Sequence, residues 1–316
     1  MTRQIIIDIS VYGMGRGAGN LNSELFLAHL NDITESRYSI KPIVNLMDEV
    51  IGKFYDENPW GYSLPNYLSA FYMIHPNYAT YLEHKKTLTL KAMGEIFDMM
   101  DPQKSLEYDE QYIEQLYITY LSRNDSKDKP LEDLARKICG RKVLLIAPGK
   151  NSFFQKEQIQ NFIKTENPVV FSINHDYPHA ESDYIFISNL RRFGQLHMRK
   201  YYKTIITSNI DSEEVYARID YRRLLNEVDH VKDNAGLMAI AFLSDYSASE
   251  FILAGFDGYS HDVYENYGTD DVAFLNNILD FDKINQGMIQ VLKNYRGKLK
   301  INFLTDSILI PKILTI

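Results

Sequence analysis

After residue 140 the chain alternates short apolar segments with helical patterns, and this alternation restricts its fold more than any other feature. Helical stretches such as Gln155–Lys164 and Gly236–Ser244 lie between most of the apolar segments. Apolar runs separated by helices are typical of parallel strands that are buried on both faces. The sequence therefore predicts an α/β fold with a Rossmann-like parallel sheet between layers of helices. The predicted strands are Lys142–Ala147, Pro168–Ile173, Tyr184–Ile187, Thr204–Thr207, Phe251–Ala254 and Lys300–Leu304.

The first half of the chain has a mostly helical pattern. One strand is predicted at Ile5–Ile9, and in Pro42–Tyr55 the apolar residues recur at helical spacing. Asn124–Pro130 is polar and ends in proline, which indicates a linker. We divide the chain into a helical region (1–125), a linker with the helix that leads into the second domain (126–139), and the Rossmann-like domain (140–316). The other predicted helices of the first half are Leu21–Asn31, Leu64–Ile74, Asn77–His84, Leu88–Met100 and Asp109–Leu121.

The composition argues against several classes of protein. Asp and Glu (42) outnumber Lys and Arg (34), and a net charge of −8 does not suit nucleic-acid binding. Cys139 is the single cysteine, which excludes a disulfide framework and a Cys-based zinc site. The apolar runs fall well short of the roughly 20 residues that span a bilayer, and the first residues do not form a secretory signal. We expect a cytoplasmic protein, free or peripheral to the inner membrane.

The densest local motif is a run of four glycines in seven positions, within Tyr12–Leu21. The run follows the first predicted strand and precedes a helix, so the backbone there can approach a ligand closely. Its G-x-G-x-G-x-G spacing differs from the dinucleotide fingerprint G-x-G-x-x-G. Two interpretations stay open, a tight strand-to-helix connection and a binding loop.

The segment Ile7–Glu24 resembles a late barrel strand and loop of the hydroxymethylglutaryl-CoA-lyase-like aldolase superfamily, which includes the 4-hydroxy-2-oxovalerate aldolases. Trp60–Pro65 and His75–Ala79 are similar to the helical tail that follows the barrel, so the resemblance covers residues 5 to about 100. It implies a metal held by an Asp and a His-x-His pair, with an Asn in some members. Asn20 matches that Asn, but the chain has no His-x-His.

One amide does not hold a catalytic metal, so the first half by itself is expected to be inactive as an aldolase. We interpret it as the tail of an aldolase-like protein. Its expected partner is an aldolase-type barrel on another polypeptide, or a second copy of the chain bound through the N-terminal helices. One alternative function is therefore that of one part of a split, metal-dependent aldolase.

In the second half, glycine or polar residues follow nearly every predicted strand. Parallel strands end at one edge of the sheet, so these residues are expected to converge in one crevice. Amide side chains both donate and accept hydrogen bonds, which suits a nucleobase edge and ribose hydroxyls. For each residue the alternative is a helix cap or a turn. The predicted nucleotide-binding residues are Gly149, Lys150, Ser152, Asn174, Asn189, Ser208, Asn209, Asn234, Gly236, Gly255 and Asp257.

Two cationic stretches stand out in this acidic chain, within Asn189–Lys203 and within Arg218–Arg223. Either they form solvated helix faces, or they clamp a phosphorylated donor or an anionic acceptor. Both interpretations stay open.

Taken in order, Pro148–Ser152, Asn174, Asp233–Met238 and Gly255–Gly258 resemble the bacterial sialyltransferase-like fold. Motility-associated glycosyltransferases and capsule or lipooligosaccharide sialyltransferases share this fold. The resemblance implies transfer from a nucleotide-activated sugar, with a CMP-linked nonulosonic acid favoured, to a glycan acceptor in surface polysaccharide or glycoconjugate synthesis. It also implies an inverting enzyme that needs no divalent metal or other cofactor. A non-catalytic nucleotide-binding or scaffold module is the alternative.

The predicted catalytic residues lie in the loop Tyr259–Tyr267. His261 is the predicted general base, because histidine titrates near neutral pH. Tyr264 and Tyr267 would hydrogen-bond the phosphate. The alternative is a surface loop whose aromatic side chains pack.

Two other patterns imitate metal sites. His175 and His179 have the i, i+4 spacing of a helical metal pair, but Pro178 between them breaks a helix. Asp280 and Asp282 imitate the Asp-x-Asp of metal-dependent glycosyltransferases, yet they fall inside a helical pattern and read as a surface acidic pair. The sequence therefore predicts no metal ligands.

Overall fold

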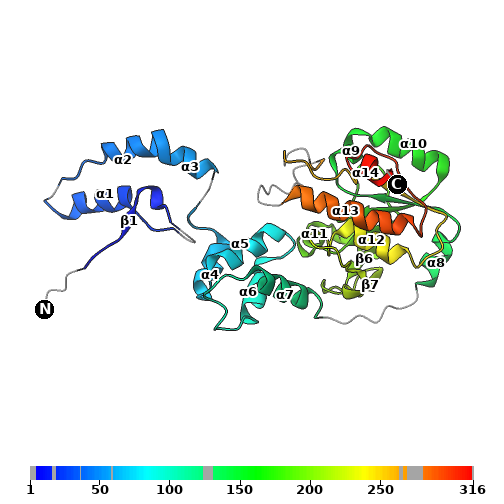
Figure 1. Cartoon of the computed structure of the whole chain (residues 1–316), viewed down its shortest axis with the longest axis horizontal. Coiled ribbons are helices and arrows are strands. Elements are labelled where there is room, and N and C mark those ends of the chain that lie inside the picture. The colour runs from blue at the N-terminus through cyan, green and yellow to red at the C-terminus, as the bar shows by residue number, and fades with distance from the viewer. Residues whose placement is uncertain are drawn as a thin grey trace. The chain divides into compact units, whose positions relative to one another are not determined.

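The computed structural model describes residues 5–15, 19–35, 37–57, 60–123, 131–262, 266–268 and 280–314. The chain divides into two compact units (Figure 1). The first comprises Met1–Lys85 and Leu90–Tyr117, and the second comprises Lys86–Thr89 and Ile118–Ile316. The predicted linker at 124–130 lies outside the described residues.

The second unit contains a seven-stranded sheet of order β7-β6-β5-β4-β3-β8-β9, in which every neighbouring pair is parallel. This confirms the predicted α/β class. The strands are β3 (Lys142–Ile146), β4 (Val169–Ile173), β5 (Tyr184–Ile187), β6 (Thr204–Thr207), β7 (Ala217–Ile219), β8 (Glu250–Ala254) and β9 (Ile301–Phe303). The helices are α8 (Glu132–Ile138), α9 (Lys150–Phe154), α10 (Lys156–Glu166), α11 (Leu190–Gln195), α12 (Ala235–Leu243), α13 (Phe281–Arg296) and α14 (Ile310–Leu314).

The strand order reverses once, between β3 and β8. From β3 the chain moves outward through β4, β5, β6 and β7, and then returns to place β8 on the other side of β3. The connections on the two sides of such a point leave in opposite directions, which opens a crevice beyond the carboxyl ends of the two strands. A bound ligand is therefore expected beyond the carboxyl ends of β3 and β8.

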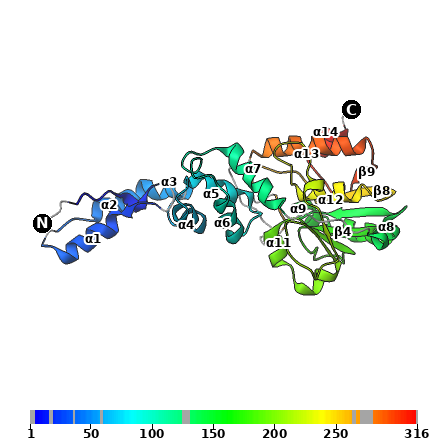
Figure 2. The ribbon, with the colours of Figure 1, turned by 90° about the horizontal axis from the view of Figure 1, so that it is seen from below.

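Helices cover both faces of the sheet (Figure 2). On one face, Leu144 and Ile146 of β3 pack with Ile159 of α10. Alternate residues of a strand point to opposite faces. Ile185 and Ile187 of β5 pack on the α11 side of the sheet, so Phe186 between them points to the opposite face. There its ring stacks on Phe242 of α12, with the ring centroids 6.1 Å apart. The sheet is therefore the buried central layer of this unit.

Two elements of the second unit differ from the prediction. β7 was not predicted, because it has three residues and the cationic Arg218 interrupts its apolar run. The sequence pattern of Val272–Tyr295 predicts one long helix, whereas α13 begins at Phe281, because the Asp280 carboxylate accepts the Lys283 backbone N–H and caps it. Residues 271–279 lie outside the described residues.

The first unit is helical, as predicted, and its core lies between α4, α5, α6 and α7. Tyr78, Leu82, Met93, Ile96 and Ile113 are almost fully buried there. The helices are α1 (Ser23–Ile33), α2 (Lys41–Leu46), a π-helical turn (Met47–Ile51), α3 (Gly52–Glu57), α4 (Leu64–Phe71), α5 (Pro76–Lys85), α6 (Leu90–Asp98) and α7 (Glu110–Leu121).

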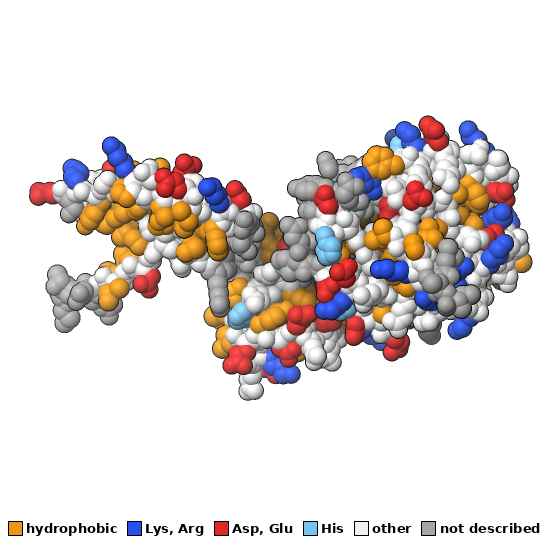
Figure 3. All heavy atoms as spheres, turned by 45° about the horizontal axis from the view of Figure 1, so that its top comes forward, with side chains coloured by type: hydrophobic (Ala, Val, Ile, Leu, Met, Phe, Trp, Pro, Cys, Tyr) orange, Lys and Arg blue, Asp and Glu red, His pale blue; other side chains and the backbone are white. Residues whose placement is uncertain are grey.

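The N-terminal part of the first unit buries few side chains. The strand predicted at Ile5–Ile9 is shorter, since β1 comprises Ile9–Ser10 and pairs with β2 (Leu21–Asn22) alone. Apolar side chains are exposed on α1 to α3, including Leu25 and Phe54 (Figure 3). The long helix predicted over 42–55 is divided by the π-helical turn. Among the described residues, no helix has both the length and the apolar character needed to cross a membrane.

The close packing at the ends of β3 and β8 can be tested with a glycine. Gly255 has φ +70°, and a Cβ there would lie 2.2 Å from the Ala147 carbonyl oxygen. Gly255→Ala is therefore expected to lower the free energy of unfolding by about 3 kcal/mol or more, through backbone strain and displacement.

Gly194→Ala is the matched control. Gly194 lies in α11 with open space around its Cα, so alanine should raise stability by about 0.5–1 kcal/mol. Urea denaturation of both variants measures the difference. Equal effects of the two substitutions would contradict the close packing.

Candidate active site

Two glycines bring the loops after β3 and β8 into direct contact. A Cβ on Gly149 would lie 2.3 Å from the Gly255 carbonyl oxygen and 2.8 Å from the Asp257 carboxyl carbon. The Ala147 backbone N–H donates to the Ala254 carbonyl at 2.9 Å, so the ladder continues past the end of β3. Gly149 and Gly255 therefore allow the two backbones to approach closely at the point where the strand order reverses.

Asp257 is the charged residue placed at this point. Its Oδ2 accepts the Asn151 backbone N–H at 2.7 Å, whereas its Oδ1 is buried and has no hydrogen-bond partner in the described part of the chain. Mainly through burial, the pKa of Asp257 is raised to about 6, with the Asn151 N–H acting against the rise and the nearby charge of Asp306 contributing to it. The carboxylate thus offers an acceptor oxygen that the described residues leave unused.

A tyrosine pair lies beside the same loop. The Gly268 N–H donates to the Pro148 carbonyl at 3.3 Å, which holds the segment 266–268 next to the end of β3. The hydroxyl of the adjacent Tyr267 is hydrogen-bonded to that of Tyr259. Burial raises the pKa of Tyr267 well above its ordinary value, with the cation of Arg192 acting against it. Both hydroxyls therefore remain protonated; one donates to the other, and the accepting hydroxyl keeps its own proton for a further acceptor.

His175 follows the end of β4. Its Nδ1 lies 2.9 Å from the Ile173 carbonyl oxygen, and its Nε2 is shielded from solvent with no partner among the described residues. Burial lowers the pKa of His175 to about 4, and the charge of Arg192 lowers it in the same direction. Arg192 is thus electrostatically coupled to both His175 and Tyr267.

The asparagines at the strand ends bond mainly to neighbouring loops. Asn174 adopts φ 56°, and its side-chain oxygen accepts the Ser188 N–H at 3.0 Å. The Asn189 oxygen accepts the first N–H groups of α11, and the Asn209 amide donates to the Ser188 carbonyl at 2.9 Å. These bonds correspond to the cap and turn interpretation, and contact of these residues with a ligand stays a prediction.

The other predicted nucleotide-binding residues have local partners as well. The buried Ser152 hydroxyl donates to the Gly149 carbonyl, and the buried Ser208 hydroxyl accepts the Tyr221 N–H. Asn234 caps α12 by accepting the Leu237 N–H. Gly236 lets the Phe256 ring approach, and the Lys150 ammonium lies 5.2 Å from the Phe154 ring centroid.

The predicted catalytic residues are not all brought together. His261 is exposed, with its Nε2 3.5 Å from the Asp282 Oδ2, and its ring contacts Phe281. Tyr267 lies at the crevice, as described above. Tyr264 lies outside the described residues. The roles assigned to the three residues stay predictions.

The cationic stretches mostly have structural partners. The Lys203 ammonium is buried and donates to the Ser182 carbonyl, and Arg191 donates to the Leu88 carbonyl. Arg223 pairs with Asp245. Most of these cations therefore bind partners within the fold. The charge of Arg192, in addition, acts to lower the pKa of His175 and of Tyr267.

Neither of the two metal-like patterns, His175 with His179 and Asp280 with Asp282, belongs to a cluster of metal ligands among the described residues. Across the described residues, no group of three or more His, Cys, Asp and Glu side chains lies close enough to hold a metal ion.

In the glycine-rich segment, the Asn20 amide donates to the Met14 carbonyl at 2.9 Å. This bond fits a tight strand-to-helix connection.

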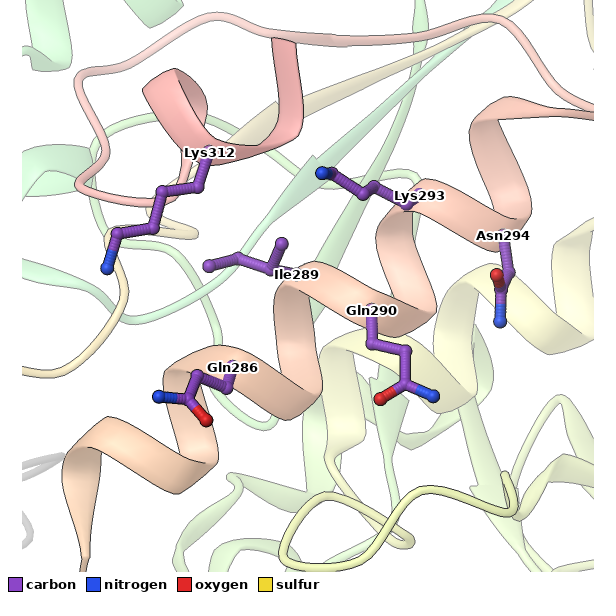
Figure 4. Close-up of a pocket in the computed structure, with 6 residues that line it drawn as sticks. All are labelled: Gln286, Ile289, Gln290, Lys293, Asn294 and Lys312. Atoms are coloured by element: carbon purple, nitrogen blue, oxygen red, sulfur yellow. The ribbon is translucent and has the colours of Figure 1, made fainter. Parts of the chain in front are cut away.

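A separate pocket of about 400 Å³ lies between α13 and α14 (Figure 4). Its lining includes Gln286, Ile289, Lys293 and Lys312. It has none of the predicted site residues, so we base the candidate site on the polar groups at the carboxyl ends of the strands.

Sequence reasoning missed two residues of the crevice, His175 and Phe153. His175 was assessed as half of a helical metal pair, whereas its position directly after a strand end was the informative signal. Phe153 has no motif of its own, but it lies four residues after Gly149, on the first turns of α9. Position relative to strand ends would have identified both.

The raised pKa of Asp257 predicts a pH-dependent stability difference from Asp257→Asn. The folded protein binds this proton more tightly than the unfolded chain, so the wild type loses stability relative to the variant as pH rises from about 4 to about 6. Above pH 6 the variant should be more stable by on the order of 2 kcal/mol, because its neutral amide keeps the Asn151 bond without a buried charge. Urea denaturation at pH 4 and pH 8 measures this, and a difference independent of pH would contradict it.

No protein-family model matches the chain, and no curated protein matches it. Among solved structures, two crystal structures of a mammalian sialyltransferase, one in complex with Gal-beta-1-3GalNAc-ortho-nitrophenol, align with 67% of this chain and 94% of theirs. The identities are 12% and 13%, and the TM-score is 0.35 for both. With a TM-score below 0.5, the assignment of the site rests on the chain's own residues, and the aldolase resemblance of the first half stays a prediction.

Proposed function

We propose that the second unit is a glycosyltransferase that moves a sugar from a nucleotide donor to a glycan acceptor. The observation that carries this proposal is the buried, unpartnered Oδ1 of Asp257 between the ends of β3 and β8. A carboxylate beyond the strand ends of a doubly wound sheet is suited to accept hydrogen bonds from ribose hydroxyls. Gly149 and Gly255 leave no side chain between that carboxylate and the backbone.

The neighbouring groups suit the phosphate of such a donor. The hydrogen-bonded pair Tyr259 and Tyr267 supplies a hydroxyl donor, since the raised pKa of both keeps them protonated and only one proton is used within the pair, and Arg192 supplies a positive charge. Donors arranged before the reaction stabilise the negative charge that develops on a leaving phosphate. The pairing of one carboxylate with a cationic, hydroxyl-rich wall therefore favours a nucleotide sugar over an uncharged ligand.

In the proposed reaction, an acceptor hydroxyl attacks the anomeric carbon of the donor sugar. The new carbon–oxygen bond forms as the bond from that carbon to the phosphate oxygen breaks, and the nucleotide leaves with the electron pair. A general base takes the proton of the acceptor hydroxyl. We favour a CMP-linked nonulosonic acid as the donor and a surface glycan as the acceptor, on the resemblance of the strand-end motifs.

Asp257 gives the proposal its first test. Among CMP, UDP and GDP, one nucleotide should stabilise the wild type in a thermal-shift assay, by about 2.7 kcal/mol at a concentration 100 times its Kd. Asp257→Ala should lose most of that stabilisation. The exposed Asp211→Ala removes the same charge elsewhere and should keep it. Absence of stabilisation by all three nucleotides, or equal stabilisation of both variants, would contradict the proposal.

The same assay should depend on pH. Ribose hydroxyls donate to the ionised carboxylate, so nucleotide affinity should fall about tenfold per pH unit below about 6, where Asp257 takes up its proton. Affinity that stays constant from pH 4.5 to 8 would argue against Asp257 as the acceptor. Hydrolysis of CMP-N-acetylneuraminic acid separates an enzyme from a non-catalytic nucleotide-binding module, which would bind CMP without turnover.

A further inference from the structure

We propose that His175, rather than His261, is the general base that takes the proton of the acceptor hydroxyl. This inference rests on the glycosyl transfer proposed above, and it assigns a catalytic residue to that reaction. It is carried by the ring's fixed hydrogen bond, its unpartnered nitrogen and its place beside the crevice.

The hydrogen bond of His175 determines which nitrogen carries the proton. Its Nδ1 lies 2.9 Å from the Ile173 carbonyl oxygen, which can only accept a hydrogen bond. Nδ1 must therefore be the donor, and in the neutral ring Nε2 is left with a lone pair. That lone pair is the group a general base needs.

No group in the described part of the chain uses this lone pair. Nε2 is shielded from solvent and has no hydrogen-bond partner there. The ring is enclosed by aromatic neighbours, with centroid distances of 6.3 Å to Phe153 and 6.1 Å to Tyr177. A buried acceptor without a donor costs free energy that a phenylalanine at this position would not incur. An O–H group of a substrate would satisfy it.

The same aromatic neighbours connect His175 to the crevice. Phe153 lies on α9, which begins directly after Gly149. Gly268, the residue after Tyr267, packs closely on the Phe153 ring. A Cβ on Gly268 would lie 1.8 Å from the nearest atom of that ring. The Tyr177 hydroxyl donates to the Ser152 carbonyl of the same helix at 2.7 Å. His175 is thus held against the helix that follows the β3 loop.

The surroundings of the ring favour its neutral form. Burial and the cation of Arg192 lower the pKa of His175, while Asp176 acts in the opposite direction. An anionic phosphate bound near Arg192 would offset that cation and make protonation of the ring less costly. The ring would therefore gain basicity when the donor is bound.

His261 has a different environment. It is 78% exposed, and its Nε2 faces the carboxylate of Asp282, which is itself exposed. In this structure its ring contacts Phe281 at the start of α13. Its nitrogen is therefore directed to a surface ion pair, whereas that of His175 is kept for a ligand.

Three variants test the assignment: His175→Gln, His179→Gln and His261→Gln. His179 is the matched control, because its ring contacts the same two rings, Phe153 and Tyr177, from the same loop. The assay is turnover of CMP-N-acetylneuraminic acid with water as the acceptor. We expect His175→Gln to lower kcat by about 10²–10⁴-fold, with CMP stabilisation within about twofold of wild type. His179→Gln should keep kcat within about threefold.

Two results would overturn the assignment. One is a kcat of His175→Gln within about threefold of wild type, and the other is a large loss in His261→Gln with none in His175→Gln. A wild type that neither binds CMP, UDP or GDP nor hydrolyses the donor overturns the proposed function itself, so the two failures are distinguishable.

A second measurement needs no substrate. In a ¹⁵N NMR spectrum of histidine-labelled protein, the signals lost in His175→Gln should show a protonated Nδ1 and a bare Nε2, unchanged between pH 5.5 and 8. A His175 that carries its proton on Nε2, or protons on both nitrogens at pH 7, would contradict the inference.

Discussion

The pairing of β3 with β8 is the constraint on which the rest of the second unit depends. Five residues of each strand are in register, from Lys142 opposite Glu250 to Ile146 opposite Ala254. Beyond the register, two glycines allow the backbones to stay in contact, and the Asn151 N–H reaches the Asp257 carboxylate. Burial of that carboxylate is a consequence of this contact. The unpartnered oxygen and the raised pKa both follow from it.

The part of the fold that is buried on both faces could be predicted closely from sequence, because burial demands continuous apolar runs. The predicted bounds of β5 and β6 match the structure, and those of β3 and β4 differ by one residue. At the edges of the sheet and on the surface this signal is weaker, although the edge strand β9 was predicted to within one residue at each end. β7 has three residues and lies at the edge of the sheet, and Ile5 is exposed although its pattern is apolar. In these places tertiary neighbours decide the structure.

For the candidate site, Gly149, Gly255 and Asp257 could be proposed from sequence, because a residue type at a strand end is a local signal, and the structure places the three in contact. Sequence did not distinguish asparagines that tie loops together from those free to meet a ligand, because that depends on which backbone group lies within reach of a short amide. Asn174 illustrates this, since its partner Ser188 follows another strand. The position of His175 after a strand end is visible in the sequence, but the state of its ring is not. That its Nε2 has no partner among the described residues can be seen only once the surrounding rings are placed.

The contact between Asn151 and Asp257 also has a consequence for the order of assembly. The two residues are 106 positions apart, and β8 is the sixth of the seven strands to leave the ribosome. A nascent chain that ends before β8 carries the β3 loop but lacks the carboxylate, and one edge of β3 is open. Contacts of such long sequence separation are slow to form, and unpaired strand edges invite association with other chains. Asp257 therefore arrives with the strand that closes this edge of β3.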